Sequence, residues 1–495
     1  MPGKRPDPTE LARTHWDLIV IGGGITGAGT LLMAARLGLK VLLVEQRDFA
    51  WGTSSRSSKM VHGGLRYIAQ GDIGLTRDAL RERERLIREL PELVVRQDYL
   101  FPIRRKRFPG RWSMKLLLWF YDRLAGIRDH RWLNRSAVLE RLPGFEQTGL
   151  KGAMTYTDAL TDDSRLVLRI LHEGTAEGGA VCNYLTADSV TAADTGFRVR
   201  VTDGCFDSTH ELRTERVINA TGAWADRLSG SEARIRPLRG SHLFVARERL
   251  PVDDCLTILH PEDGRPVFIF PWEGATCIGT TDLDHDKNLD EEPRCSRREL
   301  DYLLKLANSQ FPELQLGPSD VISTWAGVRP VISSGKGLDP SQERREHDVW
   351  ENDGVITVSG GKLTTFRLIA LDALEAAGLL DAEGRRKHGR DRTPLFSPRE
   401  LHPGGGHPLR DWPELTDTGW VEWILEHEMV VHLDDLLLRR THLGLLRPRG
   451  ARDQLDALRE PCQRLLGWND ERWAREVERY LALIEDYYSV PGGTE

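Results

Sequence analysis

The sequence predicts an α/β protein with a Rossmann-like dinucleotide-binding domain, an inserted antiparallel-sheet domain and a small helical C-terminal domain. Residues 17–45 read as strand, glycine turn, helix and strand, which together make a βαβ unit. Residues 235–325 contain several short apolar runs that are typical of an antiparallel sheet. Residues 418–488 are rich in Leu, Glu and Arg at helical spacing. A chain of 495 residues is long enough for two or three such domains.

Composition restricts the classes of protein that fit. Hydrophobic residues make up 40% and charged residues 29%, which suits a globular protein rather than a disordered one. The net charge of −7 argues against general affinity for nucleic acid. The N-terminal segment lacks the apolar core of a signal peptide, and no run approaches the roughly 18 apolar residues of a membrane span. The six scattered cysteines contain no CxxC pair, which favours reduced thiols in the cytoplasm.

The glycine motif of the first βαβ unit predicts a dinucleotide site. Gly22 permits a tight turn, Gly24 allows backbone to approach a pyrophosphate, and Gly27 allows the helix to pack closely on the strand. The helix N-terminus would offer free N–H groups to the phosphates. The same turn includes Gly23, Ile25 and Thr26. Glu45 ends the second strand and can accept hydrogen bonds from a ribose diol, although the motif does not distinguish FAD from NAD.

Residues 51–67, WGTSSRSSKMVHGGLRY, form a segment dense in glycine and small hydroxyls. Its backbone can lie against a flat ligand, and its hydroxyls can bond phosphates or ring edges. A solvated serine loop is the plain alternative. Because His62, Arg66 and Tyr67 follow a glycine-permitted turn, a loop that lines a site is the better interpretation. Residues 76–90 then predict a charged helix with Leu80, Ile87 and Leu90 on its buried side.

A basic segment follows, and it contains no acid from residue 104 to residue 115. Its cations are Arg104, Arg105, Lys106, Arg107, Arg111 and Lys115. It leads directly into the apolar, aromatic run of residues 116–121. Such an arrangement suits the headgroup region of an anionic membrane, where cations attract the surface and Trp and Leu enter it. A solvated basic loop followed by a core helix fits equally well.

Later segments predict further parts of the nucleotide fold. Residues 217–226 form an apolar strand that closes on Ala-Thr-Gly222, and such a strand would return beside the first one. Residues 355–359 form another strand, which meets the glycine turn of SGGKLTTFR and a helix that continues to Leu379. Asp162 or Asp163 would cap a helix N-terminus.

The last hundred residues divide into a linker and a helical domain. Residues 384–413 are rich in Gly, Pro and Arg and predict a linker. Residues 414–490 predict the helical C-terminal domain. Within it, His432, Asp434 and Asp435 suggest a metal site, but a helix cap with a polar face is the better interpretation, and we expect no metal.

These motifs, taken in order over almost the whole chain, resemble those of FAD-dependent glycerol-3-phosphate dehydrogenases in the D-amino-acid-oxidase-like flavoprotein superfamily. The most specific are HGGLRY and SGGKLTT; the others include INATGAWAD, RGSH, GTTD and AGVRP. The resemblance implies a noncovalent FAD, oxidation of sn-glycerol 3-phosphate to dihydroxyacetone phosphate, and a quinone as electron acceptor. It also implies peripheral attachment to the inner face of the cytoplasmic membrane. A homodimer is one arrangement that we allow for.

The resemblance divides residues 16–383 into two kinds of part. The Rossmann-like FAD-binding domain would comprise about 16–95, 150–230 and 345–383, and the substrate domain about 96–149 and 231–344. The residues expected to touch FAD are Gly22, Gly23, Gly24, Ile25, Thr26, Gly27, Glu45, Thr53, Ser54, Ser55, Ser58, Lys59, His62, Gly63, Gly64, Leu65, Gly222, Lys362, Leu363 and Thr364.

The substrate's phosphate dianion requires several cations, and arginine suits it because a guanidinium binds phosphate through two nitrogens. Matching positions in the family point to Arg66, Arg329 and Arg345, although Arg344 is an alternative to Arg345. Tyr67 would add a hydroxyl to the same pocket, and Asp282 would hold a glycerol hydroxyl or orient a histidine.

Oxidation at C2 also requires a base within hydrogen-bond reach of the hydroxyl group. His62 and His242 are both candidates, and the sequence does not decide between them. Lys362 would contact the flavin edge or the substrate. Three alternatives stay open: an oxidase that uses oxygen, a related amine or amino-acid oxidase, and a flavin-binding redox sensor without turnover.

Overall fold

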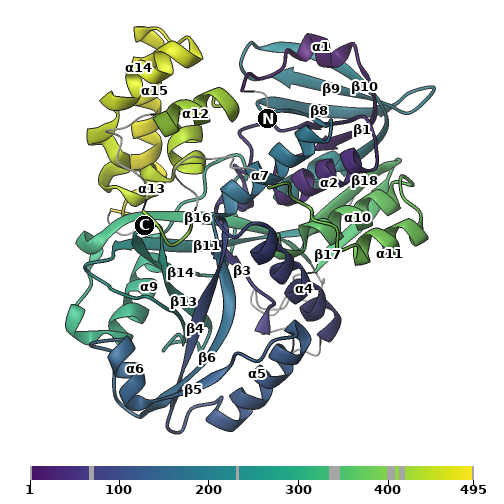
Figure 1. Ribbon diagram of the computed structural model, residues 1–495. Helices are drawn as coiled ribbons and strands as arrows, with labels where there is room; N and C mark the ends of the chain where they lie inside the picture. The colour runs from purple at the N-terminus through teal and green to yellow at the C-terminus, as the bar shows by residue number, and fades with distance from the viewer. Residues whose placement is uncertain are drawn as a thin grey trace.

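The computed structural model describes residues 3–65, 68, 72–229, 234–333, 346–398, 407–411 and 419–492. Two large sheets form the centre of the molecule, and the C-terminal helices pack beside them (Figure 1). This is the α/β architecture predicted from the sequence, with the antiparallel sheet inserted between strands of the nucleotide-binding sheet.

The first sheet contains the predicted βαβ unit. β1 (His15–Ile21) and β2 (Val41–Val44) pair in parallel, and α2 (Ile25–Arg36) connects them. β10 (Ser208–Asn219) lies parallel to β1 on its other side, and β18 (Val355–Gly360) lies parallel to β10. Both returning strands were therefore predicted correctly. The remaining strands of this eight-stranded sheet are β7 (Ala180–Cys182), β8 (Leu185–Ala192), β9 (Phe197–Asp203) and β17 (His347–Asn352).

Three helices pack together beside the first sheet. α7 (Asp163–Ala176) and α10 (Phe366–Ala376) both pack on α2. Asp162 caps α7, because its carboxylate accepts the N–H of Arg165. The predicted cap is confirmed for Asp162, whereas the Asp163 carboxylate accepts a bond from the Lys59 ammonium.

The second sheet has ten strands and is mostly antiparallel. Two of its long neighbours are β4 (Val94–Arg104) and β6 (Leu150–Thr161), which pair from Val94 and Thr161 to Arg104 and Leu150. Residues 150–161 therefore belong to this sheet and not to the FAD-binding part in which we had placed them. The other strands are β3 (Met60–Val61), β5 (Arg131–Asn134), β11 (Ile235–Ala246), β12 (Cys255–Leu259), β13 (Pro266–Trp272), β14 (Ala275–Gly279), β15 (Leu283–Asp284) and β16 (Val321–Ile332).

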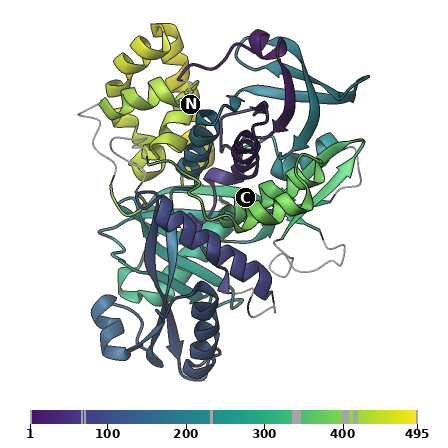
Figure 2. The same cartoon turned by 45° about the vertical axis from the view of Figure 1, so that its right-hand side comes forward.

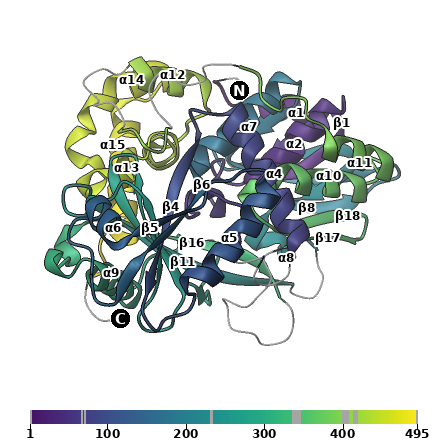
Figure 3. The ribbon, with the colours of Figure 1, turned by 60° about the horizontal axis from the view of Figure 1, so that its bottom comes forward.

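Helices cover the outside of the second sheet. α4 (Ile73–Glu89) and α5 (Arg111–Ala125) lie next to each other along β4 and β6 (Figure 3). α9 (Arg297–Gln310) begins with a reciprocal cap, in which Ser296 and Glu299 bond each other's backbone N–H groups. α6 (Arg135–Arg141) packs on β6. α4 buries Leu80, as predicted.

The predicted linker is partly helical. Residues Ala382–Arg390 form α11, whose first turn is capped by the Asp381 carboxylate and which packs on α10. Arginine and lysine tolerate a helix well, so their abundance did not indicate a loop here.

The C-terminal domain is helical, as predicted, and it lies far from α5 in both views (Figures 1 and 2). Its elements are α12 (Gly419–His427), the π-helix η7 (Asp435–Arg440), α13 (Leu443–Leu446), α14 (Asp456–Leu466), α15 (Asp470–Leu483) and the π-helix η9 (Ile484–Tyr488).

Candidate cofactor and substrate site

A cavity of about 490 Å³ lies between the two sheets. The carboxyl ends of four parallel strands of the first sheet open into it, namely β1, β2, β10 and β18. β16 of the second sheet supplies part of the opposite wall through Arg329, Pro330 and Val331. Parallel α/β sheets bind ligands outside the carboxyl ends of their strands, so the cavity is the candidate site.

The glycine turn at the end of β1 has the geometry expected of a phosphate site. Gly22 has a φ of +113°, and a Cβ atom there would lie 2.6 Å from the Ala220 carbonyl oxygen. A Cβ at Gly27 would lie 1.9 Å from the Gly22 carbonyl oxygen, so only glycine lets α2 approach the strand this closely. Gly24 precedes α2 without a side-chain cap, and Gly22, Gly24, Ile25 and Thr26 line the cavity. The first turn of α2 can therefore receive an anion.

Glu45 lines the cavity at the end of β2. Its carboxylate accepts the N–H groups of Gly23 at 2.6 Å and Arg47 at 2.9 Å. Burial raises the pKa of Glu45, while these two backbone bonds oppose the rise. Gly23 thus acts by orienting Glu45 and does not itself line the cavity. The backbone of Leu185 bonds to Glu45, so β8 continues the wall with Thr186–Asp188, which the sequence did not reveal.

The serine-rich loop supplies one side of the cavity. Thr53, Ser54, Ser58 and His62 line it, as expected, and the Ser54 hydroxyl accepts the Ile25 N–H at 2.9 Å. Ser55 does not line the cavity.

Lys59 lies elsewhere than we expected. Its ammonium is fully buried, donates to the Asp163 carboxylate at 2.8 Å and lies 4.4 Å from the centre of the Trp272 ring. It supports the loop from behind instead of lining the cavity.

Gly63, Gly64 and Leu65 also lie outside the cavity wall. The Gly63 N–H donates to the Tyr121 hydroxyl at 3.0 Å, and a Cβ there would lie 2.3 Å from Leu80. Gly63 is therefore needed for packing against α4 and α5. Arg66, Tyr67, Arg344 and Arg345 lie outside the described residues.

The two candidate histidines occupy different layers. His62 lines the cavity, and its backbone carbonyl accepts a bond from the Thr364 hydroxyl. His242 is fully buried behind Ser58, with its Nε2 atom 3.0 Å from the Ser58 hydroxyl and its ring stacked on Trp325 at 4.8 Å. Burial, and then the nearby cations Arg329 and Lys59, hold the pKa of His242 well below its usual range. Its imidazole is therefore neutral at working pH.

Arg329 is the predicted phosphate ligand that lines the cavity among the described residues. Its guanidinium donates to the Thr280 hydroxyl at 2.8 Å and to the Asp282 carboxylate at 3.1 Å. Asp282 is buried and does not line the cavity, so it orients Arg329 instead of lying open to a substrate hydroxyl. Arg329 lies opposite Leu238 of β11, and a Cβ at Gly240 would lie 2.2 Å from its guanidinium, so glycine is needed there.

A second glycine turn closes the site. Gly360 and Gly361, at the end of β18, both have a φ of +79°. Lys362, Leu363 and Thr364 follow them, line the cavity and lead into α10. These are the residues that SGGKLTT predicted. Gly222, after β10, also has a positive φ, of +59°.

Aromatic and basic side chains complete the wall, and the sequence did not identify them. Trp51 and Trp224 lie 5.8 Å apart, and Arg56 lies 4.7 Å from the centre of the Trp51 ring. Arg227 also lines the cavity. TSSRSS offered one signal, since Arg56 is the single cation among its hydroxyls.

Comparison with known families decides the class of cofactor. Residues 17–421 match the family described as FAD dependent oxidoreductase, and residues 400–473 match the C-terminal domain of alpha-glycerophosphate oxidase. The chain belongs to the FAD-dependent oxidoreductase family. FAD is therefore its cofactor, and the open first turn of α2, Glu45 and the close-approach glycines fit that group.

Two of the proteins that are similar to this chain are glycerol-3-phosphate dehydrogenases, and a third is a glycerophosphate oxidase. The chain is 36% identical over 378 residues to the aerobic glycerol-3-phosphate dehydrogenase of Staphylococcus saprophyticus. The matched region covers 74% of this chain and 67% of that relative. The structure of the glycerol-3-phosphate dehydrogenase from Bacillus halodurans, complexed with FAD, has a TM-score of 0.71 and 27% identity over 96% of this chain and 95% of that one. L-alpha-glycerophosphate oxidase from Mycoplasma pneumoniae shares the fold, with a TM-score of 0.60 and 17% identity over 74% of this chain and 95% of that one.

Proposed function

We propose that this chain oxidises sn-glycerol 3-phosphate to dihydroxyacetone phosphate, with FAD as the hydride acceptor. One observation carries the proposal: Arg329 and Ser58 both line the FAD cavity, and the Nε2 atom of neutral His242 lies 3.0 Å from the Ser58 hydroxyl. The Staphylococcus saprophyticus and Bacillus halodurans relatives, which are named as glycerol-3-phosphate dehydrogenases, support the same substrate.

The proposed roles follow from the side chains. Arg329 binds the phosphate dianion, since its guanidinium lines the cavity and Asp282 and Thr280 hold it in a fixed plane. His242 accepts the proton of the C2 hydroxyl through the Ser58 hydroxyl, which lines the cavity and lies 3.0 Å from its Nε2 atom. When bound, FAD supplies the two-electron acceptor for the hydrogen at C2. His62 holds Thr364 in the second glycine turn.

We further propose that electrons pass to a quinone and that α5 attaches the chain to a membrane surface, as expected for the inner face of the cytoplasmic membrane. No helix among the described residues is long and apolar enough to span a bilayer. α5 buries Met114, Leu118 and Tyr121 on one side and exposes large apolar side chains on the other. Phe108 is 82% exposed and Trp112 73%, and the neighbouring cations are exposed as well. Basic and aromatic side chains together suit an anionic lipid surface.

The proposal is tested by anaerobic titration of the purified holoenzyme with glycerol 3-phosphate. Loss of the oxidised flavin absorbance is the expected result, and an unchanged spectrum would refute the substrate assignment. Bleaching by an amine or amino acid instead would support the related oxidases. Turnover with a quinone analogue, compared with oxygen consumption under the same conditions, separates the dehydrogenase from an oxygen-using oxidase.

A further inference from the structure

The C-terminal domain binds two loops of the FAD cavity without entering the cavity itself. None of the described residues from 419 to 492 lines the cavity. Nevertheless, buried polar contacts join this domain to the loop from Glu45 to Trp51 and to the loop from Thr53 to Ser58.

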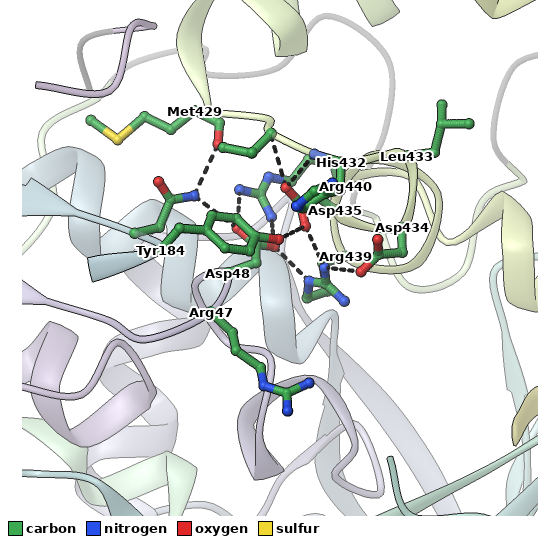
Figure 4. A network of polar contacts seen from close by, with 12 residues as sticks. Arg47, Asp48, Tyr184, Met429, His432, Leu433, Asp434, Asp435, Arg439 and Arg440 are labelled. Carbon is green, nitrogen blue, oxygen red and sulfur yellow. Dashed lines mark hydrogen bonds and ion pairs between the residues drawn. The ribbon is translucent and has the colours of Figure 1, made fainter. Parts of the chain in front are cut away.

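The first contact is centred on Asp48, which lies three residues after Glu45 (Figure 4). Its carboxylate accepts bonds from Arg439 at 2.5 Å and Arg440 at 2.7 Å. All three side chains are almost completely buried. Burial alone would raise the pKa of Asp48, but Arg440 and Arg439 outweigh it and lower the pKa. Removal of the Asp48 carboxylate would take away an ion-pair partner that both buried arginines share.

The same network continues into the C-terminal domain. Arg439 also binds Asp434 at 2.8 Å and Asp435 at 2.6 Å, and Tyr184 donates to Asp435 at 2.6 Å (Figure 4). Asp435 in turn accepts the backbone N–H groups of Val431 and His432. Two sets of contacts therefore hold η7 in place. Arg439 and Arg440 bind Asp48, and Asp435 in the first turn binds the backbone of the preceding loop.

On its cavity side, the Asp48 loop is joined to the phosphate turn. The Ala50 N–H donates to the Gly23 carbonyl at 3.0 Å, and Gly23 donates to Glu45 at 2.6 Å. A displacement of Asp48 would therefore move Gly23 and, through it, Glu45, which lines the cavity.

The second contact reaches the serine-rich loop. Arg56, which lines the cavity, binds the Glu292 carboxylate, and the Tyr488 hydroxyl donates to the same carboxylate. The Tyr488 oxygen also lies 3.3 Å from Arg56. Burial raises the pKa of Tyr488, so its hydroxyl stays protonated and available to Glu292. η9 thereby supports the orientation of Arg56 from outside.

We propose that Asp48 and Tyr488 are positioning residues through which the C-terminal helical domain keeps both loops in the FAD-binding conformation. FAD affinity and the order of the C-terminal domain are then coupled, and by linkage each must strengthen the other to the same extent. The coupling depends on FAD and not on the identity of the substrate, so it survives if the proposed function fails.

The test measures coupling in both directions on the full chain. In the first arm, hydrogen exchange of residues 435–440 is compared between apoprotein and FAD-saturated protein. We expect FAD to slow this exchange about five-fold or more, the lower end of typical coupling. In the second arm, the Kd of FAD is measured by fluorescence for wild type, Tyr488→Phe and the neighbouring control Tyr487→Phe. Tyr488→Phe removes one hydroxyl and should raise the Kd about five-fold or more, while the control stays within about two-fold.

Asp48→Asn gives an independent measurement at the other contact and should also raise the Kd of the folded apoprotein. A purely structural role would lower the thermal midpoints of apoprotein and holoprotein equally and leave the Kd unchanged, and that result would overturn the proposal. Unchanged exchange in residues 435–440 of the wild type on FAD binding would overturn it as well, without any variant.

Discussion

Arg329 has two functions at the residue scale, because the guanidinium that faces the cavity also holds Thr280 and Asp282. We predict that Arg329→Lys raises the KM for glycerol 3-phosphate about ten-fold or more, since an ammonium loses the planar arrangement of donors. FAD content should not change, because the phosphate turn of β1 is untouched. Steady-state kinetics and the flavin-to-protein ratio measure the two effects.

Arg236→Lys is the matched control. Arg236 lies on β11, as His242 does, and it pairs with Asp284 without lining the cavity. Its KM should equal that of the wild type. A KM for Arg329→Lys that also matches wild type would remove Arg329 from the substrate site.

Glu299 is a second residue with a specific consequence. Its carboxylate accepts bonds from the Ser241 hydroxyl at 2.8 Å, the Thr281 hydroxyl at 2.7 Å and Arg239 at 2.9 Å. Ser241 precedes His242 and Thr281 precedes Asp282, so one carboxylate fixes both neighbours. We predict that Glu299→Gln lowers kcat/KM about ten-fold through misplacement of these groups.

Glu262→Gln serves as the control for Glu299→Gln. It removes an exposed carboxylate that pairs with Lys305, and Lys305 belongs to α9, as Glu299 does. Equal kcat/KM values in the two variants would show that Glu299 only caps α9.

The backbone geometry of the glycine turns could be predicted from the sequence, because it is decided locally. Gly22, Gly27 and Gly360 each have a φ or a close contact that the motif itself demands. The sequence did not place Lys59 or Asp282, because the direction of these side chains depends on Asp163 and Arg329, which are distant in sequence. Trp51 and Arg56 were missed for the same reason.

At the scale of elements, α5 carries the membrane proposal. We predict that the double substitution Trp112→Ser and Leu116→Ser lowers binding to vesicles with anionic lipid about ten-fold or more, because two large exposed side chains no longer enter the interface. Sedimentation with vesicles at several salt concentrations measures the effect. Raising the salt should weaken wild-type binding as well, since the cations of residues 105–107 are screened.

Phe206→Ser is the matched control, because Phe206 is 78% exposed at the turn between β9 and β10, which α5 does not include. If the α5 variant sediments like Phe206→Ser, the membrane surface lies on another element.

Elements with a strong periodic pattern were predicted correctly, including β1, α2, β10 and β18. Two assignments differed. Residues 150–161 joined the second sheet because β4 pairs along their whole length, and only that long-range partner decides the sheet. α11 formed within the expected linker because Asp381 caps it and α10 offers a surface for it.

At the scale of the whole molecule, acid should weaken the attachment of the C-terminal domain. In Asp48, Asp434 and Glu428, burial is outweighed by nearby arginines, and the pKa of each carboxyl group is lowered. The unfolded chain therefore binds more protons than the folded chain as pH falls below about 4.5. These groups contribute stability above that pH and lose it below. Asp435 acts in the opposite sense, since burial, Asp48 and Asp434 raise its pKa.

Because Asp48, Asp434 and Glu428 lose their ion pairs with arginine when they are protonated, we predict that the thermal midpoint falls between pH 5 and pH 3. Asp434→Asn removes one contributor, which Arg439 and Arg479 now stabilise as a carboxylate, and its midpoint should fall by at least about 2 °C less over that interval. Calorimetry at constant ionic strength measures both curves, with the exposed Asp456→Asn as control. Parallel curves for wild type and Asp434→Asn would mean that the network around Asp48 does not determine acid stability, and that the two domains are held together mainly by their apolar contacts.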